Sequence, residues 1–150
     1  MNYQRQIVSM VGSELQSAGF SRLRQHTWMR KVDQMATLVN VQIVGTSRYI
    51  NVSLFLDRLP PPPKFLEQYG AIRFRERQFI DEELVPRSDE DLDTLEDPLG
   101  EYRLRVAVPV ISRVSAWLCL GDVSRDLSRG VVREAFIHKD ARPLLRASRK

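Results

Sequence analysis

The residues that most often carry chemistry are few in this sequence. It contains two histidines, His26 and His138, and one cysteine, Cys119. They stand far apart and form none of the His-x-x-x-His or Cys-x-x-Cys spacings with which three or four ligands hold zinc. Cys119 lies in the apolar run 116–120, so we expect a small buried thiol rather than a nucleophile. A single cysteine allows no internal disulfide, which is typical of a reducing compartment.

The carboxylates are concentrated in one window, and there they are expected to be solvated. Between positions 81 and 101 the chain has ten acidic residues and one basic residue, Arg87. The run 89–93 lacks the glycine turn of a calcium-binding loop. Neither a glycine-rich phosphate loop nor a Gly-x-Ser-x-Gly motif occurs elsewhere. The sequence therefore identifies no catalytic residue, metal site or cofactor, although folding can still bring a pair of carboxylates together.

Arginines give the clearest sign of a binding surface. Arg73, Arg75 and Arg77 alternate with residues of another kind and therefore share one face of a predicted strand. Arg30 follows Trp28 by two residues on an earlier predicted strand. If the two faces coincide, they form a basic sheet surface with an aromatic ring, which is a way to hold single-stranded nucleic acid. Alternatively, the arginines form a solvated outer face and Trp28 belongs to the core.

Hydrophobic periodicity predicts the elements that must position these side chains. Apolar residues recur at helical spacing in 3–18 and alternate with polar residues in four later segments. The short links between the first three segments favour an antiparallel meander, and the four prolines at 60–63 carry the chain away from it. We predict an α+β fold, in which a four-stranded antiparallel sheet is packed on one face by the N-terminal helix and by C-terminal helices beyond residue 98. The predicted strands are 25–32, 36–44, 48–57 and 71–79.

The same patterns predict the core. Apolar residues on one side of the strand at 36–44 should face the helices, and those of the first helix should pack against them. The predicted core comprises Ile7, Val11, Leu15, Phe20, Val39, Val41, Ile43, Val52, Leu54, Val106, Val110, Leu118 and Leu127.

The chain of 150 residues is the right size for a single domain, 1–150. We expect a mobile acidic segment near 81–97, whose carboxylates include Asp89, Glu90, Asp91 and Asp93. Because Arg73, Arg75 and Arg77 lie just upstream, this segment is predicted to fold back over them as an electrostatic lid. The basic tail 141–150 is expected to fray. With neither a signal-peptide pattern nor a long apolar stretch, the expected location is cytoplasmic, away from the membrane.

Three short motifs carry a resemblance to a known family. They are Gly19-Phe20 after the first helix, Trp28-Met29-Arg30, and Asn40-Val41-Gln42. Their order resembles a family of small uncharacterised bacterial proteins, a domain of unknown function with Gly-Phe, Trp-x-Arg and Asn-x-Gln elements. The resemblance covers residues 10–130 and implies an α+β fold with no established activity. Some members accompany toxin–immunity systems, so it also implies a protein-binding role of immunity type.

These observations favour a non-enzymatic protein-interaction module over an enzyme. The charge is strongly segregated: outside the acidic window the chain has 22 basic and nine acidic residues, and such a surface steers a charged partner. The expected partner is a protein of unknown identity. Nucleic-acid binding through the arginine-rich face is the alternative, and the sequence does not indicate an oligomeric state.

Overall fold

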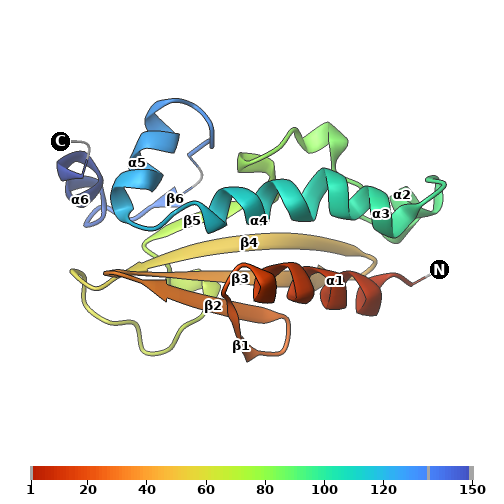
Figure 1. Ribbon diagram of the computed structural model, residues 1–150, viewed down its shortest axis with the longest axis horizontal. Helices are drawn as coiled ribbons and strands as arrows, with labels where there is room; N and C mark the ends of the chain where they lie inside the picture. The colour runs from red at the N-terminus through yellow and green to blue at the C-terminus, as the bar shows by residue number, and fades with distance from the viewer. Residues whose placement is uncertain (1, 135, 149–150) are drawn as a thin grey trace.

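Six strands form one antiparallel sheet and follow one another in chain order from β1 to β6 (Figure 1). The computed structural model describes residues 2–134 and 136–148. The strands are β1 Ser21–Arg24, β2 Thr27–Val32, β3 Met35–Val44, β4 Ser47–Leu56, β5 Ile72–Arg75 and β6 Phe136–Ile137. The predicted α+β class and antiparallel sheet are confirmed, but the predicted number of four strands is wrong. The two missed strands, β1 and β6, are four and two residues long, too short to display an alternating pattern.

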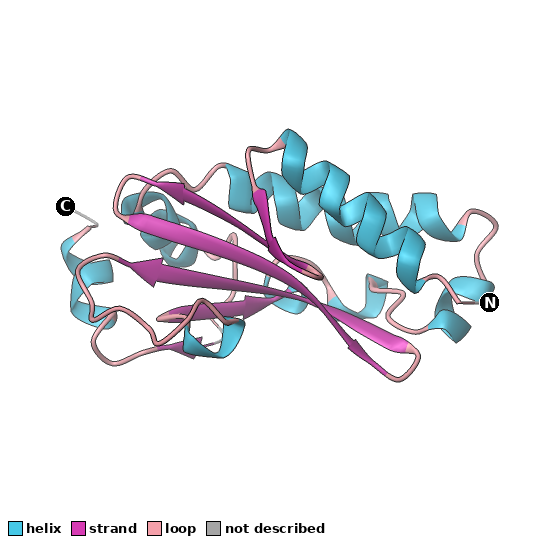
Figure 2. Ribbon diagram, turned by 90° about the horizontal axis from the view of Figure 1, so that it is seen from below, coloured by secondary structure: helices cyan, strands magenta, loops and turns pink. Residues whose placement is uncertain are grey.

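Helices cover one face of this sheet, and α1 and the α3–α4 run lie side by side along it (Figure 2). The helices are α1 Gln4–Ser17, α2 Asp89–Asp93, α3 Pro98–Tyr102, α4 Val108–Ser115, α5 Leu120–Ser128 and α6 Arg142–Ala147. Pro109 lies within the continuous α3–α4 run, since Ala107 and Val108 before it keep right-handed helical angles. A π-helical turn, Arg103–Ala107, precedes it and changes the local hydrogen-bond pattern where the proline lacks an N–H.

The core between sheet and helices contains nearly all the residues predicted for it. Ile43 and Leu127 are partly buried against it, whereas Leu118 is 55% exposed. Cys119, expected to be buried, is also exposed. Both residues lie in the link between α4 and α5, and the neighbouring Trp117 is the side chain that enters the core. In this apolar run, therefore, the tryptophan is buried in the core, whereas Leu118 and Cys119 are not.

The opposite face of the sheet, here called the outer face, is half covered by the chain between β4 and β5. Phe65 of this segment packs edge-on against Phe55, with ring centroids 5.0 Å apart. The hydroxyl of Ser53 donates to the carbonyl of Glu67 at 2.8 Å, and Gly70 lies so close to Ser53 that a Cβ would approach its side chain to 2.7 Å. The segment with the four prolines thus leaves the meander and returns across its apolar half.

Among the described residues, the carboxylates of the acidic segment form no ion pair with Arg73, Arg75 or Arg77, so the segment does not form the predicted lid over them. Asp81 pairs with Arg133, and the carboxylate of Asp89 pairs with the buried Arg48. Leu92 is fully buried in the core, and α2 is capped by the side chain of Ser88. The segment therefore packs beside the β3–β4 hairpin, where Ser47 bridges to Ser88, because its apolar residues and cap anchor it there.

The C-terminal residues predicted to fray include α6, in which Leu145 is buried; positions 149–150 lie outside the described residues. None of the described helices is long and apolar enough to cross a bilayer.

Candidate functional site: an arginine pocket on the outer face

Strand β5 places two of the predicted arginines on the outer face. Ile72 and Phe74 point into the core, so the alternating Arg73 and Arg75 point the other way. The chain then enters a 3-10 turn, Glu76–Gln78, in which Arg77 is exposed. The three arginines that the sequence grouped together therefore border one pocket on this face.

Arg73 is held by an aromatic ring rather than by a carboxylate. Its guanidinium carbon lies 3.9 Å from the ring centroid of Phe136, its partner in the β5–β6 pairing. The Nε of Arg73 is buried and has no hydrogen-bond partner among the described residues. A buried N–H of a cation without an acceptor is unfavourable. The Nη groups of Arg73, which are not among the buried unpaired atoms, are the donors that an anion in the pocket can reach.

Arg75 is fixed by neutral amides and a second ring. Its Nε donates to the Oδ1 of Asn51 at 3.2 Å, and its Nη2 donates to the Oε1 of Gln42 at 3.3 Å. The guanidinium carbon also lies 4.5 Å from the ring centroid of Tyr49. The amide of Asn51 in turn donates to Gln42 and Asn40. This ladder orients Arg75 without neutralising its charge.

A fourth arginine, Arg87, reaches the same ring from the acidic segment. Its guanidinium carbon is 4.9 Å from the centroid of Tyr49, and its Nη2 donates to the Oε1 of Glu76 at 3.1 Å. Burial alone would lower the pKa of Arg87, but the hydrogen bond and charge of Glu76 outweigh it and raise that pKa. Arg87 is therefore a paired cation, unlike Arg73 and Arg75.

Arg73, Arg75 and Arg77 border a pocket of about 360 Å³, here called the arginine pocket. Its lining comprises Gln42, Asn51, Ser53, Glu67, Gln68, Arg73, Phe74, Arg75, Arg77, Gln78 and Phe136. Glu67 is the one carboxylate in that lining. Among the described residues Arg73, Arg75 and Arg77 form no ion pair. The pocket therefore has excess positive charge and fits a small anionic group.

Trp28 and Arg30, which the sequence placed with these arginines, lie on the opposite face of the sheet. Trp28 is only 3% exposed and packs against Gly12 of α1. Arg30 donates to backbone carbonyls at the C-terminal ends of α1 and α4, including Ala18 and Ser115. The predicted faces thus do not coincide, because β2 turns Trp28 and Arg30 toward the helices while β5 turns its arginines away from them.

Sequence reasoning missed most of the residues that orient the arginines. Asn51 lies on the outer face of β4, and only the β4–β5 register sets it opposite Arg75. Phe136 belongs to a two-residue strand. Tyr49 and Arg87 come together from separate elements. The alternation in β4 is the signal that could have suggested Tyr49 and Asn51 as neighbours of the β5 arginines.

Neither a search for metal ligands nor comparison with known proteins assigns a function to the chain. In residues 2–134 and 136–148 no group of three or more His, Cys, Asp or Glu side chains is placed to hold a metal ion. Comparisons with protein-family models, with curated proteins and with solved structures found no match to the chain. The chemistry of the arginine pocket therefore carries the functional argument.

Proposed function

We propose that the protein is a non-enzymatic protein-interaction module that takes an acidic group of a partner protein into the arginine pocket. The observation that supports this most is the set of three arginines without ion pairs around one opening. Arg73 and Arg75 are held in place by rings and amides, so little side-chain entropy is lost when an anion binds. A guanidinium with free N–H groups binds a carboxylate with directed, charge-assisted hydrogen bonds.

The resemblance stated above suggests a narrower form of this proposal. An immunity-type protein neutralises a toxin by binding it, and a strongly charged surface speeds such an encounter. The partner would then present aspartate or glutamate to the pocket, and its association would slow as salt rises.

Nucleic-acid binding is the second candidate, and one observation favours it. Phe136 is 40% exposed beside Arg73, and an aromatic next to an arginine can stack with a base. The size of the pocket argues against it. The arginine pocket has a volume of about 360 Å³, and Glu67 and Gln68 of the segment between β4 and β5 form part of its lining. This volume suits a single anionic group better than a strand of several nucleotides.

Fluorescence anisotropy with a labelled tetraglutamate peptide tests the proposal. We expect the double variant Arg73→Gln/Arg77→Gln to bind about tenfold more weakly than the natural chain at low salt. The control is Arg58→Gln/Arg129→Gln, which removes the same charge from two exposed arginines that line no part of the pocket. Equal losses in both variants, or stronger binding of octathymidylate than of the peptide, would overturn the proposal.

A further inference from the structure

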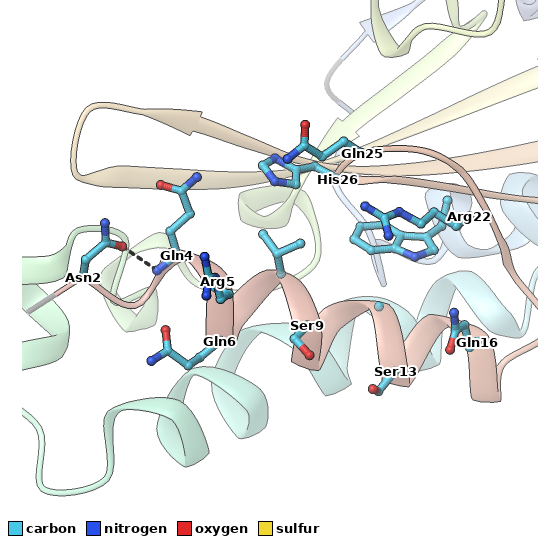
Figure 3. A pocket seen from close by; sticks show the side chains of 13 residues that line it. Asn2, Gln4, Arg5, Gln6, Ser9, Ser13, Gln16, Arg22, Gln25 and His26 are labelled. Carbon is cyan, nitrogen blue, oxygen red and sulfur yellow. Dashed lines mark hydrogen bonds between the residues drawn. The ribbon is translucent and has the colours of Figure 1, made fainter.

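A large hollow lies on the helix side of the sheet, between α1 and the β1–β2 hairpin. It has a volume of about 860 Å³ and is here called the α1 groove. Figure 3 shows Gln4, Ser9, Ser13 and Gln16 along α1, with Arg22, Gln25 and His26 on the hairpin side. Trp28, which lines this groove, and the arginines of the arginine pocket lie on opposite faces of the sheet, so the sheet separates the two features.

The formal charge of the α1 groove is positive and comes from two arginines. No aspartate or glutamate occurs among its lining residues, whereas Arg5 and Arg22 are both present. Figure 3 shows Arg5 toward the Asn2 end of the groove and Arg22 toward the Gln16 end. Both arginines are exposed and form no ion pair within the described part of the chain. An occupant with negative charge spread along its length complements this arrangement.

The uncharged walls indicate what else the occupant must offer. The side-chain amides of Gln4, Gln6, Gln16 and Gln25 make no hydrogen bond with another described residue. Each amide has donors and an acceptor, and a peptide backbone presents both kinds of group. A phosphodiester backbone presents only acceptors, which would leave the amide oxygens unused. Of the two aromatic rings in the lining, the indole of Trp28 is almost fully buried and offers no face for stacking a base. The imidazole of His26 is then the one ring that a base could contact, whereas single-strand binding uses several such rings.

The length of the groove matches a short extended peptide. From Gln4 to Gln16 the helix rises about 18 Å at 1.5 Å per residue. An extended chain advances about 3.3 Å per residue, so five or six residues span that distance. We propose that the α1 groove binds an extended, acidic segment of a partner protein, with Arg5 and Arg22 facing its carboxylates and the glutamines facing its backbone. This inference does not rest on the function proposed for the arginine pocket.

The test uses a fluorescein-labelled octapeptide of alternating glutamate and valine, followed by anisotropy at low salt. The variant Arg5→Glu/Arg22→Glu should bind at least about tenfold more weakly, while the control Arg58→Glu/Arg129→Glu should bind like the natural chain. Ser9→Glu, at an exposed position on α1, keeps both arginines and should also weaken binding. Ser9→Glu therefore tests the inference independently if circular dichroism shows that the double variant is unfolded.

Three results would overturn the inference. The first is no binding of the glutamate–valine peptide to the natural chain, or equal binding of a lysine–valine octapeptide. The second is a loss caused by Arg73→Gln/Arg77→Gln but not by Arg5→Glu/Arg22→Glu, which would place the peptide in the arginine pocket and leave only the proposed function standing. The third is tighter binding of octathymidylate than of the acidic peptide, with the same dependence on Arg5 and Arg22.

Discussion

Replacing Arg30 by methionine would remove the cation that donates hydrogen bonds to the C-terminal carbonyls of α1 and α4. The Nη1 of Arg30 donates to the carbonyls of Ala18 and Ser115, each at 3.3 Å. The Nη2 donates to Val114, Ser115 and Trp117 at 3.3, 3.3 and 3.1 Å. Ala18 caps the C-terminus of α1, and Ser115 ends α4. Burial lowers the pKa of Arg30 because few charged partners replace the lost water.

The size of the effect follows from these contacts. A hydrogen bond to a charged group contributes about 1.5–3 kcal/mol net, and a cation at a helix C-terminus adds about 0.3–1 kcal/mol. The bonds share one guanidinium and are not additive. We therefore expect Arg30→Met to lower the free energy of unfolding by about 3 kcal/mol, or the melting temperature by about 6–12 °C. Arg30→Lys keeps the charge but not the fork of donors, and should lose about 1–2 kcal/mol.

Urea unfolding followed by tryptophan fluorescence measures this loss. The matched control is Lys31→Met, since Lys31 is the next residue of β2 and its pair with Asp57 is exposed on both sides. That control should change stability by less than about 0.5 kcal/mol. If Arg30→Met is as stable as Lys31→Met, the helix ends do not depend on Arg30 and the reasoning is refuted.

Three further stability predictions test other parts of the fold. Gly12→Ala should lose about 1–2 kcal/mol despite its better helix propensity, because the new Cβ would lie 2.9 Å from the rigid, buried indole of Trp28; a melting temperature above that of the natural chain would contradict it. Glu76→Gln should lose about 3 kcal/mol in urea unfolding, since the carboxylate is 1% exposed and accepts from the backbone of Ile50, and a neutral result would show that the charge is not needed. Burial of Asp122 would raise the pKa of its carboxyl, but a backbone hydrogen bond and a nearby arginine hold that pKa below its usual value. The carboxylate therefore stabilises the fold above about pH 4, and this stabilisation is lost as pH falls through the folded-state pKa. Asp122→Asn should reduce the acid-side loss of stability in urea midpoints measured from pH 7 to pH 3, and an unchanged slope would contradict the prediction.

The central meander was predictable because its strands alternate clearly over many residues. Along the ten residues of β3, alternation places Val39 and Val41 in the core and Asn40 and Gln42 on the other face of the sheet. β6 could not be predicted, since two residues show no period and their pairing with β5 depends on the tertiary fold. Cys119 illustrates the opposite error. Its apolar neighbours suggested burial, but the turn between two helices leaves it at the surface.

The candidate site was predictable only in part, for a similar reason. Alternation within one strand was enough to group Arg73 with Arg75. The other residues on the face of Arg73 and Arg75 are determined by the register between β4 and β5. A long segment connects these two strands, so the sequence does not predict that register. The predicted acidic lid is wrong because charge density alone does not determine where a segment packs. The buried Leu92 fixes that segment beside the β3–β4 hairpin, far more strongly than exposed ion pairs of about 1 kcal/mol could redirect it.

The proposed function is tested most directly at the arginine side chains themselves. Nuclear magnetic resonance of the ¹⁵N-labelled protein observes each Nε–Hε group, and Arg→Lys variants assign the signals. On titration with triglutamate we expect the Nε–Hε signals of Arg73 and Arg75, whose side chains line the arginine pocket, to shift more than those of other arginines. The signal of Arg30, on the far side of the sheet, should stay in place. Unmoved Arg73 and Arg75 signals at saturating peptide, or equal shifts of every exposed arginine, would contradict binding in the arginine pocket.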